Sequence, residues 1–214
     1  TTANDIYFKR ADGSSQAERL LRSISDLPPV WEVHFSRDGQ WIIYRVETGS
    51  SDIYAVRSRT DSVPLELLTT GASERMPVLS PDGRWLAYAS NMSGTNEVYV
   101  RPFPNVDDWM QQVSTSGGIA PHWANSGDEL FYRNARNELV AVQIENATGS
   151  IFQWSEQRTL FSVDGFLTAN NRHQYDVAPD DQRFVFLRLT SDADPTEVIV
   201  VENWFEELKG IGND

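Results

Sequence analysis

Short apolar stretches alternate along the chain with clusters of Gly, Asp, Asn and Ser. Within many of these stretches apolar and polar residues alternate, which is the two-residue period of a β-strand with one buried face. Helical periodicity is weak everywhere except at 203–210, where we expect a short terminal helix that ends at Gly210. The pattern therefore predicts an all-β protein.

The most regular part of this pattern is a turn motif that recurs along the chain. Three copies, at 33–44, 77–88 and 121–132, begin 44 residues apart, and a fourth at 175–186 begins 54 residues after the third. Each copy is an apolar stretch, a polar turn and a second apolar stretch, and further apolar stretches follow it. Four antiparallel strands in a repeat of about 40–50 residues are typical of a β-propeller blade.

The turns have residue types that suit a tight connection between strands. In the second copy Pro81 presets its own φ, Asp82 can hydrogen-bond the nearby backbone, and Gly83 supplies a positive φ at no steric cost. The third turn lacks Pro and the fourth lacks Gly, so these turns can differ in type. The position just before each turn is apolar in all copies and is expected to be buried: Phe35, Leu79, Trp123 and Val177.

The repeat predicts one propeller domain over residues 1–214. Its expected parts are a partial blade at 1–29, blades at 30–72, 73–116 and 117–165, a partial blade at 172–202 and a C-terminal tail at 203–214. About four four-stranded blades result, fewer than most propellers have. Either the chain is part of a larger propeller, or its ends meet in a small ring with 6–8 beside 198–201, or a second copy completes it.

Composition narrows the function classes. The chain has 40% hydrophobic and 23% charged residues, as a packed soluble globule does, and its apolar runs are too short for membrane insertion. Its net charge of -13 repels phosphate backbones and argues against a nucleic-acid partner. Cysteine is absent, which excludes disulfides and thiolate metal sites. The chain begins without Met or a signal-peptide pattern, which indicates a mature product or a fragment.

The repeats resemble the WD-like propeller repeats of TolB and of many bacterial sensor proteins. The similarity is greatest in "SPDGRWLAYASNMSGTNEVYVRPFP" (80–104) and continues in "QVSTSGGIAPHW" (112–123) and "YDVAPDDQRFVF" (175–186). The ending "VIVVENWFEELK" (198–209) resembles the tail of extracytoplasmic propellers attached to bacterial Ser/Thr kinases or winged-helix regulators. The resemblance implies a propeller fold, a periplasmic location and a sensor or scaffold region of a larger bacterial protein.

Four residues are candidates for ligand binding, all near the expected innermost strands. His34 and His122 share one repeat position with Asp176, so they either converge near the central channel to bind a metal or an anion, or are ordinary strand residues. His173 shares a position with Arg75 just before the innermost strand, where a propeller lines its mouth, so both are candidate contacts for a polar ligand. We assign no catalytic residue, cofactor site or metal site.

The aspartates of the turns allow two interpretations. Asp38, Asp82 and Asp180 recur there, and carboxylates are calcium ligands. Calcium takes six or more oxygen ligands, however, and one turn Asp supplies few of them. We therefore expect these residues to cap their turns.

Three functions fit the sequence. The first is a non-catalytic module that binds a protein, peptide or glycan ligand at the face of the blade-connecting loops. The second is an enzyme, either a glycosidase-like propeller hydrolase or the propeller gate of a prolyl-oligopeptidase-like peptidase, although no G-x-S-x-G motif is present. The third is a structural remnant of a larger protein. Unpaired strand edges would also favour a homodimer.

Overall fold

The computed structural model describes residues 6–21, 29–47, 49–58, 63–145, 151–188 and 198–201. The helix expected at 203–210 lies outside these residues. The regular elements of the described residues are β-strands, and none of these residues forms a helix that could span a bilayer. The prediction of an all-β fold is confirmed.

Three four-stranded antiparallel sheets form the main part of the molecule, in the order of the chain. The first contains β3 (Val30–Phe35), β4 (Trp41–Glu47), β5 (Ser51–Arg57) and β6 (Leu65–Leu68). The second contains β7 (Glu74–Leu79), β8 (Trp85–Ser90), β9 (Glu97–Pro102) and β10 (Gln111–Gln112). The third contains β11 (Gly118–Trp123), β12 (Glu129–Asn134), β13 (Glu138–Ile144) and β14 (Trp154–Ser162). Each sheet is one blade of a propeller.

Smaller sheets lie at the two ends of the described chain. A fourth blade has three strands, β15 (Tyr175–Val177), β16 (Phe184–Leu187) and β17 (Val198–Val201). The N-terminal hairpin pairs β1 (Ile6–Phe8) with β2 (Glu18–Leu21). In this structure β1 is therefore not part of the sheet of β17, as closure of a small ring by the two ends would require.

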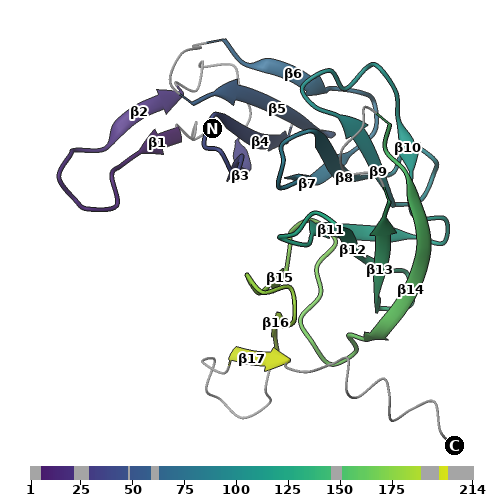
Figure 1. The fold of residues 1–214 in the computed structure, drawn as a ribbon. Coiled ribbons are helices and arrows are strands. Elements are labelled where there is room, and N and C mark those ends of the chain that lie inside the picture. The colour runs from purple at the N-terminus through teal and green to yellow at the C-terminus, as the bar shows by residue number, and fades with distance from the viewer. Residues whose placement is uncertain are drawn as a thin grey trace, which may run out of the picture.

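The blades follow one another along an arc and do not close into a ring (Figure 1). Apolar side chains fill the space between neighbouring sheets. Ile43 of the first blade packs with Leu86 and Tyr88 of the second, and Trp85 of the second packs with Leu130 of the third. The core is thus a series of layers between blades, as the propeller architecture requires.

The turns have the geometry that the sequence predicts. Gly83 has φ 72°, and the corresponding glycines of the first and third blades, Gly39 and Gly127, have φ 67° and 82°. In the fourth blade Asp181 takes this place with φ 57°. The fourth turn therefore keeps the same left-handed position, because Asp tolerates this region better than most residues do.

The turn aspartates act as caps. Asp38, Asp82 and Asp180 each accept a hydrogen bond from the backbone N–H two residues later, at 2.9, 3.0 and 3.1 Å. In the first two turns a serine hydroxyl also donates to the same carboxylate at 2.6 Å. The prediction of capping is confirmed.

One part of the predicted core is wrong. Trp123 and Val177 are buried before their turns, with 5% and 6% of their surface exposed, but Phe35 is 56% exposed. Trp123 packs against the second blade and donates its indole N–H to the carbonyl of Val78. Before the first blade stands only the two-stranded hairpin, whose Ile6 packs with Tyr44 and Val46 but leaves Trp31 exposed as well. This position is buried by the preceding blade and not by its own.

Candidate functional site

The three histidines come together where the innermost strands converge. The rings of His34 on β3 and His122 on β11 each lie 6.1 Å from the ring of His173, which precedes β15. His122 Nε2 lies 2.9 Å from Asp176 Oδ1, and His173 Nε2 lies 2.9 Å from the carbonyl oxygen of Pro121. We call His34, His122, His173 and Asp176 the axial cluster. It joins the first, third and fourth blades.

The surroundings of two imidazoles of the axial cluster, those of His34 and His173, favour the uncharged form. Burial lowers the pKa of His173 to about 4, and it also lowers the pKa of His34. The hydrogen bond from His122 lowers the pKa of Asp176. Among the described residues no three His, Asp or Glu side chains are placed to hold a metal ion. A ligand-binding role for these histidines stays a prediction.

Arg75 lies apart from the histidines. It belongs to β7 itself, not to the segment before it, and its guanidinium contacts Ser51 Oγ at 3.0 Å and Glu47 at 3.7 Å. Beside it Arg45, with only 2% of its side chain exposed, pairs with Glu32 at 3.0 Å and also with Glu47. We call Glu32, Arg45, Glu47, Ser51 and Arg75 the Arg45 network.

The Arg45 network joins the first two blades and the connection that precedes β15. Glu32 accepts a bond from the backbone N–H of Met76 in the second blade at 3.2 Å. Arg45 donates to the carbonyl of Asn171 at 3.3 Å, in the connection between β14 and β15. Buried charges cost little only when they are paired and hydrogen-bonded, and here both conditions are met. The network therefore holds the blades and this connection together.

A cleft of about 580 Å³ is lined by residues of the second and third blades and of the segment before β15. These residues lie in the β8–β9, β10–β11 and β12–β13 connections, at the adjoining ends of β9, β11 and β12, and before β15: 95–97, 115–119, 133–135, 137 and 170. We call it the loop cleft. Most of its lining side chains are Thr, Ser, Asn or Gly, and none is aromatic. Such a surface offers hydrogen bonds more than apolar contact area.

The floor of the loop cleft is rigidly held. Glu97 is buried, and its carboxylate accepts hydrogen bonds from the Ser114 hydroxyl and, at 2.9 Å, from the Gly117 N–H. A Cβ on Gly118 would lie 2.3 Å from Ser114 Oγ, so this close packing requires glycine. The groups that face the cleft are thus preorganised, which lowers the entropy cost of binding.

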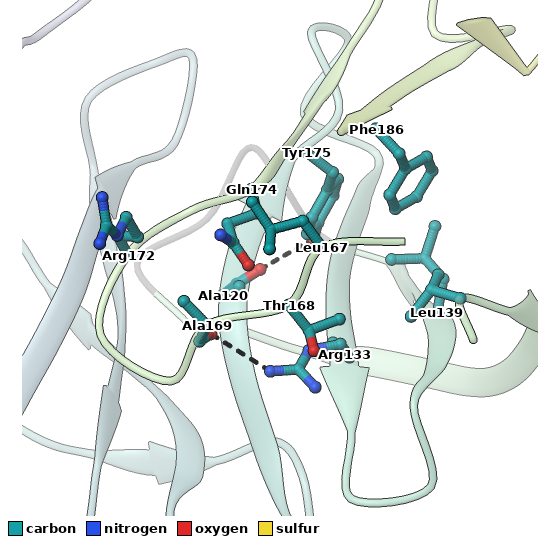
Figure 2. Close-up of a pocket in the computed structure, with 11 residues that line it drawn as sticks. Ala120, Arg133, Leu139, Leu167, Thr168, Ala169, Arg172, Gln174, Tyr175 and Phe186 are labelled. Atoms are coloured by element: carbon teal, nitrogen blue, oxygen red, sulfur yellow. Dashed lines mark hydrogen bonds between the residues drawn. The ribbon is translucent and has the colours of Figure 1, made fainter. Parts of the chain in front are cut away.

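Arg133 lines both the loop cleft and a smaller pocket of about 20 Å³. Figure 2 shows it among the residues of the smaller pocket. Its guanidinium donates to Asn137 Oδ1, to the carbonyl of Ala169 at 3.2 Å and to Asn170 Oδ1 at 3.0 Å. Burial lowers the pKa of Arg133. All of these acceptors are neutral, and Arg133 forms no ion pair with any described residue.

Sequence reasoning missed the loop cleft and Arg133. Many lining residues of the cleft lie in connections whose sequences differ between blades, so the repeat does not identify them. A signal for Arg133 was present, because Tyr44-Arg45 recurs as Tyr132-Arg133 two 44-residue periods later. The partners of these two arginines differ, and only the structure shows how.

No known family model matches the chain, and no curated protein matches it. Solved structures of similar fold include TolB from Acinetobacter baumannii, with 17% identity and a TM-score of 0.63 over 90% of this chain. They also include the Myceliophteria thermophila Cps50 (Swd1) β-propeller domain, with 9% identity and a TM-score of 0.57. That match covers 86% of this chain and 60% of the Cps50 chain.

A chain of a nidogen/laminin complex is also similar, with 11% identity and a TM-score of 0.56 over 88% of this chain and 69% of that one. This chain spans 44% of the length of the TolB chain. These likenesses, with the sheets described above, show a TolB-like, WD-repeat-like propeller fold.

Proposed function

We propose that the chain is a non-catalytic binding module that recognises a protein, peptide or glycan at the loop cleft. The observation that carries this proposal is the cleft itself, which is lined by polar residues of successive blades over a rigid floor. Binding sites are commonly built from connections that a rigid scaffold positions. The similar fold in a nidogen/laminin complex supports a protein partner.

The setting of this module is part of the same proposal. The likeness to TolB supports an extracytoplasmic, periplasmic location and a role as sensor or scaffold region of a larger bacterial protein. The net charge of -13 supports a partner other than nucleic acid.

The ion pairs of Glu32 and Glu47 favour a binding module over a glycosidase. A glycosidase needs two carboxylates that act on the substrate as acid and as base or nucleophile. Glu32 and Glu47 lie close together, but both pair with Arg45. They are therefore engaged in holding the blades. Turnover of substrates in a broad glycosidase and peptidase panel, abolished by Glu32→Gln, would support the enzyme instead.

A blocking substitution tests the proposed site. Ser116 is exposed at the cleft, so Ser116→Trp should fill it without disturbing the core, whereas Asn105→Trp places the same ring outside the cleft. Peptide and glycan arrays are probed with the labelled wild-type protein and both variants. We expect spots that the wild type and Asn105→Trp bind and Ser116→Trp does not. Equal binding by all three proteins would overturn the assignment of the cleft.

We also propose that the chain forms a homodimer through exposed apolar side chains of β1 and β3. Tyr7 of β1 and Trp31, Val33 and Phe35 of β3 are 42–61% exposed. Exposed apolar patches favour association, and closed two-fold dimers are the commonest result. Light scattering at micromolar concentration should give about twice the chain mass of 24.2 kDa. A particle that remains at the chain mass on concentration would refute the dimer.

A further inference from the structure

Arg45 and Arg133 occupy equivalent positions in two blades. Each follows the tyrosine of its blade in the second strand, and they are two 44-residue periods apart. In the first blade Arg45 lies opposite Glu32 in the strand register, and Glu47 follows it by two residues. Both carboxylates pair with its guanidinium. In the first blade the arginine at this position is thus neutralised by two carboxylates.

In the third blade alanines stand at both sequence positions, and Ile119, not Ala120, lies opposite Arg133 in the strand register. Ala120 stands two periods after Glu32, and Ala135 stands two periods after Glu47. Arg133 is half-buried and has only amide and carbonyl oxygens as acceptors. A guanidinium has five N–H donors in a fork that matches a carboxylate, and a desolvated charge of this kind gains from an anionic partner.

The two alanines also leave space beside Arg133. Ala120 lines the small pocket, and Ala135 lines the loop cleft, which is open to solvent. In Figure 2 the guanidinium lies below Thr168 and is held on one side by Ala169. An incoming group reaches Arg133 from the cleft. Asn137 Oδ1 accepts from Nη1, the nitrogen that pairs with Glu47 in the first blade, so a carboxylate takes the second N–H of Nη1 or replaces this amide contact.

We propose that the loop cleft binds a peptide through a carboxylate that pairs with Arg133 in the way that Glu47 pairs with Arg45. This inference rests on the proposed function of the cleft and names its ligand. A peptide is favoured over a glycan because the cleft has no aromatic side chain for a sugar ring to stack on. Its Asn and Thr side chains and its glycine backbone can instead hydrogen-bond peptide groups.

Nuclear magnetic resonance titration with short probes tests the ligand class. The probes are N-acetyl-Ala-Ala-Ala with a free C-terminal carboxylate, its C-terminal amide, the amide of N-acetyl-Ala-Asp-Ala, and D-glucuronate. Signals of Gly117 and Gly118 report on the cleft. We expect the carboxylate peptides to bind at least about tenfold more tightly than the neutral amide, as a charge-assisted hydrogen bond provides. The first and third probes separate a C-terminal from a side-chain carboxylate.

A matched pair of variants tests Arg133 without removing it. Ala135→Glu should supply an internal carboxylate, as in the first blade, and abolish binding of the carboxylate peptides. Ala135→Gln has nearly the same size but no charge, so it controls for the added bulk, and it should weaken binding much less than Ala135→Glu does. The structure lets both fold, because Ala135 is exposed.

Each contrary outcome identifies what fails. Equal affinity for the neutral amide and the carboxylate peptides would show that the cleft binds peptides but does not recognise their carboxylate. Binding of glucuronate alone would show that the ligand is not a peptide. Full binding by Ala135→Glu, or shifts that avoid Gly117 and Gly118, would overturn the role of Arg133. Absence of binding by every carboxylate probe would overturn the inference, whereas the array experiment with Ser116→Trp decides the cleft's function separately.

Discussion

The first and third blades are built on one repeat, yet equivalent residues in them have different surroundings. Trp123 is buried between two blades, whereas Phe35 at the same position is 56% exposed. Arg45 is neutralised by two carboxylates, whereas Arg133 has neutral partners only. The repeat thus determines the backbone of a blade, while burial and charge pairing depend on what stands next to it. Substitutions at equivalent positions measure this difference.

The largest difference is expected for the aromatic pair. Trp123→Ala should lower the free energy of unfolding by about 3–5 kcal/mol, because it opens a cavity between two blades. In the single chain Phe35→Ala should lower it by less than about 1 kcal/mol, because the side chain is largely in solvent. Urea denaturation followed by circular dichroism measures both, at a protein concentration low enough to separate the proposed dimer. Equal losses at that concentration would contradict the contrast, whereas a cost of Phe35→Ala that rises with protein concentration would show that a second copy covers this side chain.

The arginine pair should differ by somewhat less. Arg45→Met leaves the carboxylate of Glu32, only 10% exposed, without its cation and should cost about 3 kcal/mol. Arg133→Met removes a charge without stranding a carboxylate and should cost less than about 1 kcal/mol. The same denaturation experiment applies. Glu32→Gln in the Arg45→Met background should recover part of the loss, and a cost for Arg133→Met as large as for Arg45→Met would contradict the contrast.

The axial cluster should make stability depend on pH. His173 lies equally far from His34 of the first blade and His122 of the third, and burial lowers its pKa from 6.5 to about 4. Between these pH values His173 is protonated in the unfolded chain but not in the folded protein. The free energy of unfolding should therefore fall as the pH is lowered from 6.5 towards about 4. His173→Gln should flatten this part of the profile. An unchanged slope would show that His173 is not its source.

The smallest effect should be the same in both blades. Gly39 and Gly127 both have a positive φ, and a Cβ on either meets nothing closer than ordinary contact. Gly39→Ala and Gly127→Ala should each cost about 1–2 kcal/mol, from the backbone conformation alone. Thermal denaturation of the two variants is sufficient. A cost that differs clearly between them would show that the blades differ in their turns as well.

The sequence by itself determined the strands, the turns and the succession of blades. These features depend on neighbouring residues: the alternation within a strand, and the Ser-Pro-Asp-Gly chemistry that gives Gly83 its positive φ and Asp82 its capping bond. The shared repeat position of His34 and His122 left open whether they converge near the central channel or are ordinary strand residues. Both contact His173 in the structure.

Only the tertiary structure decided which of these equivalent positions are buried, paired or open. The exposure of Phe35 depends on whether a sheet precedes its own, and the place of Arg75 depends on Ser51 and Glu47 in another blade. The loop cleft depends on where the segment before β15 crosses to Arg133. Such contacts join residues far apart in the chain. The local sequence pattern does not predict these contacts, because a strand with the same alternation can pack against many different segments.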